Sequence, residues 1–279
     1  MKIQELFSKD ISRAINGVVK AEQMDEASVW QELDEFVVTK ELLKHFDRFF
    51  SVYSDSIDQP DDVDISGNIG VWVSGFFGSG KSHFIKALSC LFKNNEVGSH
   101  GDKKKALEFF EEKIDDSLLF GTMKRVVVKD ADVILFNIDS KADQSKERDA
   151  ILSVFLKVLN ELQGYSPDHP HIAHMERYLE QKNKLDTFCK IFMELVGSSW
   201  DEERENYMYN QDEIVKALSQ TLGQSEEASH RWIDHAETDF SLTVENFTCW
   251  VKEYLDSKGA ERRIFFFVDE IGQFIGQDG

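Results

Sequence analysis

The stretch GFFGSGKS at residues 75–82 decides the fold, because it matches the pattern G-x-x-x-x-G-K-[ST] in full. Residues 69–74, Ile-Gly-Val-Trp-Val-Ser, precede it and predict a short buried strand. Residues 81–92 follow it with apolar side chains at helical spacing and predict a helix. Strand, glycine loop and helix in this order are the context of a phosphate-binding loop. A chance glycine- and serine-rich turn before a helix is the alternative, and the flanking pattern disfavours it.

Each residue type in this loop has a physical task. Glycines allow backbone conformations and close approaches that a Cβ atom would block. Backbone amides of residues 78–81 can then point into one concavity, to which the positive end of the following helix adds. Lys81 is expected to reach the β- and γ-phosphates, and the hydroxyl of Ser82 to bind Mg²⁺. We therefore assign nucleotide binding to Gly75, Phe76, Phe77, Gly78, Ser79, Gly80, Lys81, Ser82 and His83, with no catalytic role for His83.

A second candidate segment lies 188 residues further along the chain, counted from Lys81 to Asp269 (269 − 81). Residues 264–270, Ile-Phe-Phe-Phe-Val-Asp-Glu, predict a buried strand ending in two carboxylates and resemble a Walker B motif. Asp269 would hold Mg²⁺ opposite Ser82, and Glu270 would orient the attacking water as a catalytic residue beside Lys81. Asp139, which follows a β-rich run at residues 132–138, is a rival end for the motif. It ranks second because no Glu is adjacent to it.

The composition of the chain argues against several other classes of function. The 279 residues carry 52 acidic and 32 basic side chains, and this net charge of −20 disfavours broad binding to DNA or to an anionic membrane. The longest uninterrupted apolar run, residues 264–268, is far too short to span a bilayer. Three distant cysteines favour reduced thiols in the cytoplasm. The histidines at positions 169, 171 and 174 fit a polar loop or helix start better than a metal site.

The pattern of elements predicts an α/β protein with a parallel sheet. We expect a mainly helical segment at residues 1–66, with residues 51–67 as a surface loop. The first part of a nucleotide-binding core should occupy residues 67–144, with helical residues at 104–123 and β-rich runs at 125–128 and 132–138. A helical insertion is expected at residues 145–260, and the core resumes at residues 261–279.

Several segments together resemble one family. They are MKIQELF at residues 1–7, INGVVK at 15–20, VWQELDEFVVT at 29–39 and GVWVSGFFGSGKSHF at 70–84. The sequence is similar to the large P-loop ATPase of BREX phage-defence systems, called BrxC, or PglY in the related phage-growth-limitation system. The resemblance runs from residue 1 to the strand before Asp269. It depends on the N-terminal and loop blocks in combination, since many families share the loop alone.

The resemblance implies an AAA+-like P-loop NTPase fold, similar to origin-recognition ATPases, that uses ATP and Mg²⁺. It implies other BREX proteins, such as the methyltransferase, as partners, and it allows homo-oligomers. Contact with DNA is expected only indirectly or through missing regions. By the same resemblance, Val37 and Val38 help to enclose the adenine, although packing in a helix core explains them nearly as well. Family members are much longer, so this sequence resembles an N-terminal fragment with an incomplete sheet. A strand between the loop strand and the Walker B strand, the sensor residue and the arginine-bearing helices would be missing, and weak activity is expected.

Three functions compete at this point. The leading hypothesis is an ATPase of phage defence. A nucleotide-gated scaffold that assembles a defence complex with little turnover is the alternative, and Glu270 argues against it because a scaffold needs no water-orienting acid. A P-loop kinase would need an acceptor pocket and lid arginines, and no segment of the sequence is recognisable as either.

Overall fold

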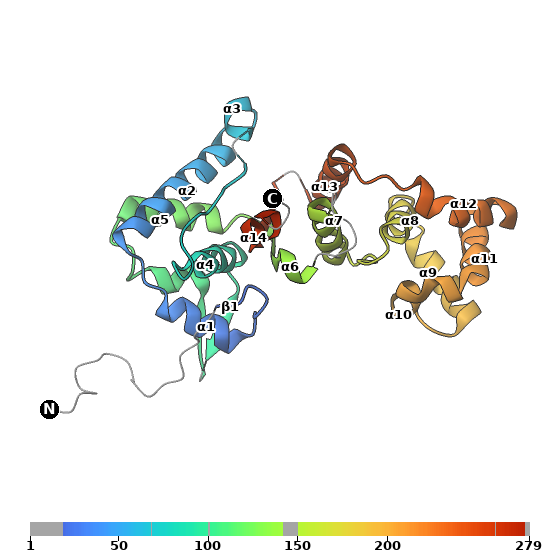
Figure 1. The fold of residues 1–279 in the computed structure, drawn as a ribbon, viewed down its shortest axis with the longest axis horizontal. Helices are drawn as coiled ribbons and strands as arrows, with labels where there is room; N and C mark the ends of the chain where they lie inside the picture. The colour runs from blue at the N-terminus through green and yellow to red at the C-terminus, as the bar shows by residue number, and fades with distance from the viewer. Residues whose placement is uncertain (1–18, 68, 100, 142–149, 260, 277–279) are drawn as a thin grey trace. The chain divides into compact units, whose positions relative to one another are not determined.

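The computed structural model describes residues 19–67, 69–99, 101–141, 150–259 and 261–276. The chain divides into two compact units, residues 1–139 with 261–279 (unit 1) and residues 140–260 (unit 2). We expected the helical insertion to begin at residue 145, which lies outside the described residues. Helices dominate both units, and the described strands all belong to unit 1 (Figure 1). This mixed, helix-rich architecture with one parallel strand pair is compatible with the α/β class.

The described elements of unit 1 are α1 (Glu26–Glu35), α2 (Lys40–Asp58), α3 (Val63–Ser66), α4 (Lys81–Lys93), β1 (Glu96–Ser99), β2 (Asp102–Lys105), the 3₁₀ helix η2 (Ala106–Phe110), α5 (Ser117–Val127), β3 (Ala131–Asn137), β4 (Arg263–Asp269) and α14 (Ile271–Gly276). Helix α6 (Ile138–Lys141) crosses from unit 1 into unit 2. The helices expected near residues 29–50 and 81–92 are therefore present, as are the strands expected near 132–138 and 264–269.

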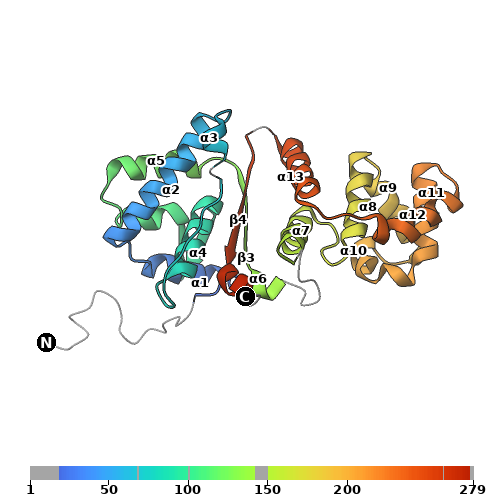
Figure 2. The same cartoon turned by 45° about the horizontal axis from the view of Figure 1, so that its top comes forward.

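β3 and β4 form a parallel pair in which Asn137 lies opposite Asp269 (Figure 2). Side chains alternate between the two faces of a strand. Phe265 and Phe267 pack against the core that contains α4, and the ring of Phe92 on α4 stacks 4.2 Å from that of Phe265. By the same alternation, Asn137 and Asp269 point to the α4 side at the carboxyl ends of their strands. Residues 263–268 are half-buried, so β4 is less enclosed than the sequence predicted.

The expectation of a surface loop at residues 51–67 is wrong, because α2 continues to Asp58 and α3 follows. Tyr53 and Ile57 continue the apolar face of α2 and pack against the core of unit 1. Arg125 of α5 binds Asp58 at 2.7 and 2.9 Å. Asp62 caps α3 by accepting two backbone N–H groups. Two of the aspartates that indicated a loop thus serve helices, Asp58 as an ion-pair partner and Asp62 as a cap.

Residues 125–128 are not β-structure, because α5 continues through Val127 and ends there. Asp116 caps α5, and Met123, Val126 and Val127 are buried at helical spacing. Tertiary packing therefore overrides the β propensity of three consecutive valines. The lysines at positions 103–105, expected on a helix, lie instead on β2, which pairs antiparallel with β1.

The buried strand expected at residues 69–74 is also absent. These residues have no regular secondary structure, and the side chains of Ile69, Val71 and Trp72 are between 61% and 85% exposed. Val73 alone of this segment packs against the core. A strand needs a hydrogen-bonded neighbour, and the sheet that the structure describes here contains β3 and β4.

Unit 2 is an assembly of helices around its own apolar core. Its described elements are α7 (Ala150–Gln163), α8 (Pro170–Gln181), α9 (Leu185–Val196), α10 (Trp200–Glu203), the 3₁₀ helix η3 (Arg204–Tyr209), α11 (Gln211–Leu222), α12 (Glu226–Asp239) and α13 (Val244–Lys258). His171 contacts the hydroxyl of Tyr207 at 2.9 Å, and His169 contacts the carbonyl of Glu205 at 3.1 Å. These histidines join α8 to η3, in keeping with the helix start predicted there.

Candidate functional site

The glycine loop enters α4 through two left-handed residues. Gly78 has φ of 74° and Gly80 has φ of 88°, conformations that strain any residue with a Cβ atom. Gly80 is the N-cap of α4, and its carbonyl accepts the N–H of Phe84 at 2.9 Å. A Cβ atom on Gly75 would lie 2.7 Å from the hydroxyl oxygen of Ser79. The glycine pattern is therefore required by a tight turn that delivers the chain into a helix N-terminus.

Lys81 folds back over this turn. Its Nζ atom donates to the carbonyl oxygens of Gly75 and Phe76, each at 3.0 Å. The amide of Ser79 also donates to the carbonyl of Phe76, at 3.2 Å. The loop thus concentrates a lysine ammonium group and backbone amides at the positive end of a 13-residue helix, which suits an anion.

Ser82 and Asp269 bring the two sequence motifs together. The Ser82 hydroxyl donates to Asp269 Oδ1 at 3.1 Å, although the residues are 187 positions apart. Ser82 lies in the first turn of α4, and Asp269 lies at the end of β4 on the side that faces α4. Asp269 is only 8% exposed, so its carboxylate is held where few alternative partners are available. The two residues predicted to bind Mg²⁺ are therefore direct neighbours.

Glu270 follows with an unusual backbone. Its φ is 62°, which is uncommon for a residue other than glycine, asparagine or aspartate. Its N–H donates to Asp269 Oδ1 at 3.0 Å, and its carbonyl accepts the N–H of Phe274 in α14 at 3.3 Å. The side chain of Glu270 is half-exposed, whereas the neighbouring Asp269 is buried. Backbone strain of this kind is concentrated at functional sites.

The remaining predicted residues have different surroundings. Phe76 and Phe77 at the tip of the loop are 91% and 100% exposed. The ring of His83 contacts the carbonyl of Glu32 at 2.9 Å and packs edge-on against Phe36, so it joins α1 to α4. Val37 and Val38 lie between α1 and α2; Val37 is exposed and Val38 packs against the core. His83 therefore has a structural contact of its own.

The structure also distinguishes between Asp139 and Asp269, the two candidate carboxylates for the end of the second motif. Asp139 is exposed in α6, two residues beyond the end of β3, and its N–H donates to Asn137 Oδ1 at 2.9 Å. Asp269, rather than Asp139, contacts Ser82. Asn137 itself was missed from the sequence, although it lies opposite Asp269 on the same face of the sheet. A polar residue directly after the apolar run 133–136 was the available signal.

The donor set at this point fits magnesium. Within the described ranges, no cluster of three or more His, Cys, Asp or Glu side chains could hold a metal ion by itself. Mg²⁺ needs no such cluster, because it is usually bound by one or two protein oxygens, substrate phosphates and water. Ser82 and Asp269 supply one hydroxyl and one carboxylate oxygen. They fit a metal that is shared with a phosphate ligand and do not fit a dedicated metal cage.

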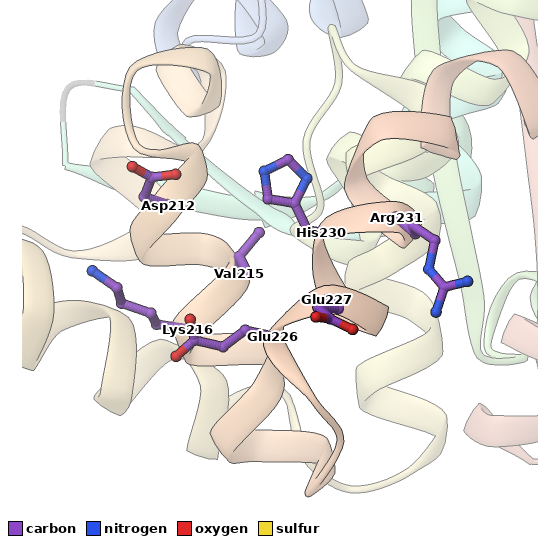
Figure 3. A pocket seen from close by; sticks show the side chains of 7 residues that line it. All are labelled: Asp212, Val215, Lys216, Glu226, Glu227, His230 and Arg231. Carbon is purple, nitrogen blue, oxygen red and sulfur yellow. The ribbon is translucent and has the colours of Figure 1, made fainter.

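A separate concavity of about 650 Å³ lies in unit 2, between α11 and α12 (Figure 3). It is lined by Asp212, Val215, Lys216, Glu226, Glu227, His230 and Arg231. All but the valine are exposed, and the lining contains both acidic and basic side chains. None of the residues predicted to bind nucleotide lies there, and the mixed charges select no one ligand class.

No protein-family model matches the sequence, and no solved structure matches the chain. Among the described helices, none has the length and apolar character needed to cross a membrane. A functional assignment therefore depends on the residues themselves and on the geometry of the loop, Ser82 and Asp269.

Proposed function

We propose that this chain binds ATP with Mg²⁺ at the loop of residues 75–82, as part of an AAA+-like P-loop ATPase. The observation that carries the proposal is the hydrogen bond between Ser82 and Asp269. It joins the last residue of a full G-x-x-x-x-G-K-[ST] match to the acidic end of an apolar strand. A chance glycine turn would have no reason to meet that carboxylate. The pairing is the one that shared coordination of Mg²⁺ requires.

Each residue has a distinct task in this proposal. Mg·ATP supplies the transferable phosphoryl group and the divalent charge. Lys81 exchanges its carbonyl partners for β- and γ-phosphate oxygens, and the amides at the start of α4 hold the same oxygens. Ser82 and Asp269 would hold the metal through one hydroxyl and one carboxylate oxygen. Glu270, which is half-exposed beside the buried Asp269, would accept a hydrogen bond from the attacking water and orient it.

A nucleotide-gated scaffold with little turnover is the second candidate. It needs the same binding groups but no carboxylate to orient water. The backbone of Glu270 favours the ATPase, because a strained residue costs on the order of 1–3 kcal/mol and persists where a function retains it. Turnover by the full-length protein, with and without its partners, distinguishes the two candidates.

The resemblance to the BREX ATPase adds a biological setting. We propose that the activity serves bacteriophage defence in the cytoplasm, together with other BREX components such as the methyltransferase. Homo-oligomers are compatible with an AAA+-like protein. Direct DNA contact by these 279 residues is not part of the proposal, because a net charge of −20 opposes it.

Calorimetry with ATP and Mg²⁺ tests the binding site directly. Lys81→Ala should weaken binding by about 2–4 kcal/mol, because it removes a charge-assisted contact to phosphate. Lys93→Ala is the matched control, since Lys93 ends the same helix at its other terminus. Asp269→Asn should lower the Mg²⁺-dependent part of the affinity. Equal affinity of the wild type and Lys81→Ala would refute the assignment.

A further inference from the structure

Unit 2 presents two neighbouring apolar side chains to solvent at the end of η3. Met208 is 66% exposed and Tyr209 is 88% exposed, whereas Tyr207 before them is 7% exposed. A 3₁₀ helix turns by about 120° per residue, so a helix that buries Tyr207 points the next two side chains outward. Aromatic side chains and methionine are enriched at protein–protein interfaces relative to the rest of a protein surface. The pair is therefore a candidate contact surface.

Hydrogen bonds fix the backbone that carries this pair. The hydroxyl of Tyr207 contacts Nε2 of His171 on α8 at 2.9 Å. At the start of η3, Arg204 donates to the carbonyl of Gly164, the residue after α7, at 2.5 Å. Both ends of η3 are thus tied to other helices of the same unit. A partner that binds here meets side chains on an ordered backbone, so the entropic cost of ordering the surface is small.

Acidic residues flank the pair on both sides in the chain. Residues 201–213 carry six acidic side chains and one basic side chain, a net charge of −5 (1 − 6). The basic residue is Arg204, which is 17% exposed and bonded within the unit. Among the acidic residues, Asp201, Glu202 and Asp212 are exposed. The surface therefore combines an apolar centre with negatively charged flanks on α10 and on the first turn of α11.

This combination selects one class of partner. The negative flanks repel DNA and anionic lipid surfaces. They also oppose a second copy of this chain, whose net charge is −20. A basic polypeptide segment is attracted to the flanks, and its side chains can cover the apolar centre. An arginine guanidinium placed over the ring of Tyr209 gains contact area and a cation–π attraction together.

We propose that Met208 and Tyr209 form the centre of a docking surface for a basic segment of a partner protein. Lysine or arginine side chains of that segment face the acidic residues of α10 and of the first turn of α11. The docking surface lies entirely in unit 2 and contains none of the residues of the phosphate-binding loop. The inference therefore goes beyond the proposed function and does not depend on it.

Fluorescence anisotropy with a short labelled peptide of alternating arginine and leucine tests the docking surface in the 279-residue chain. Tyr209→Ser should weaken binding about tenfold, because it removes the central aromatic contact. Tyr178→Ser is the matched control, since Tyr178 is 41% exposed on α8 of the same unit, and it should leave the affinity unchanged. Asp212→Asn should weaken binding about twofold and reduce its salt dependence. Equal affinity of the wild type and Tyr209→Ser would overturn the proposal, because binding would then depend on charge alone.

Hydrogen exchange of the same chain locates the bound peptide. Backbone amides of residues 201–213 should exchange more slowly with the peptide present, and amides of unit 1 should not change. Absence of binding at low salt, or protection confined to other segments, would overturn the docking surface. Protection of residues 201–213 by a DNA duplex instead of the peptide would also overturn it. Lys81→Ala should bind the peptide as the wild type does, so a failure of nucleotide binding and a failure of docking are distinguishable.

Discussion

Lys86 offers a quantitative test of how α4 is held in unit 1. Its side chain is 1% exposed, one turn beyond the phosphate-binding residues. The ammonium group lies 2.7 Å from Glu32 Oε2 of α1 and donates to the carbonyls of Lys20 and Gln23 at 2.8 and 2.5 Å. Within the described residues, neither oxygen of Glu32 has a hydrogen bond from another group. Lys86 is therefore the group that compensates a carboxylate that is 5% exposed.

Lys86→Met should destabilise unit 1 by about 3–5 kcal/mol, because it leaves the charge of Glu32 buried and unpaired. The loss of partners for two carbonyls adds to the cost. Replacing both residues, Lys86→Met with Glu32→Leu, should recover much of this loss, since an apolar pair of similar volume avoids the desolvation of both charges. The magnitude follows from the burial of the pair, because exposed ion pairs contribute only about 0–1 kcal/mol.

Urea unfolding followed by circular dichroism measures these changes, with separate transitions allowed for the two units. Lys44→Met is the matched control, because Lys44 pairs with Glu41 at 2.8 Å while both side chains are at least 70% exposed. That control should change stability by less than about 1 kcal/mol. A loss below about 1 kcal/mol for Lys86→Met, or a double variant no more stable than the single one, would refute the reasoning.

Three further outcomes are expected. Glu270→Gln in the full-length protein should retain ATP affinity while turnover falls by about 100-fold, and an equal loss of binding and turnover would instead indicate a metal ligand. Glu270→Gly should in addition raise the free energy of unfolding by about 1 kcal/mol, because it relieves the left-handed strain. Burial raises the pKa of Glu176 above its ordinary value of 4.5, so the folded state binds that proton more tightly than the unfolded chain. Thermal unfolding should therefore show that the wild type becomes more stable relative to Glu176→Gln as pH falls from neutral toward 4.5. A difference in stability between the two proteins that stays constant with pH would contradict this expectation. Fluorescence anisotropy with a DNA duplex should detect no binding near physiological salt, and salt-dependent binding would point to the exposed lysines at positions 103–105 of β2.

The candidate site was more predictable from sequence than the surrounding fold. A glycine loop, a helix start and a carboxylate at a strand end are local features with defined backbone requirements. Gly78 and Gly80 have the positive φ angles that their positions in the motif demand. Ser82 and Asp269 meet because one follows the loop directly and the other ends a strand that faces α4. Asn137 escaped notice because its importance depends on the register between β3 and β4, which no local pattern encodes.

The errors in the predicted secondary structure share one physical cause. The secondary-structure propensity of a residue does not specify which other residue it will contact. Three valines at positions 126–128 favour a strand, yet two of them are buried against the core as the last turn of α5. The aspartates between residues 55 and 64 suggest a loop, yet Asp58 pairs with Arg125 and Asp62 caps α3. Each residue type was compatible with two structures. For Asp58 the contact that selected between them came from a distant part of the chain, whereas Asp62 caps the helix that directly follows it.

The segment at residues 69–74 shows what this means for the site. In the described structure it has no strand pairing, and its contact with the core is made by Val73, so it holds the phosphate-binding loop weakly from the N-terminal side. The loop is instead fixed from α4, through Ser82 to Asp269, through His83 to the carbonyl of Glu32, and through Lys86 to the side chain of Glu32. Consecutive turns of one helix thus contact both the end of β4 and α1. Substitutions along α4 or in α1 should accordingly alter the geometry of the candidate site more than substitutions in residues 69–72, whose apolar side chains are exposed.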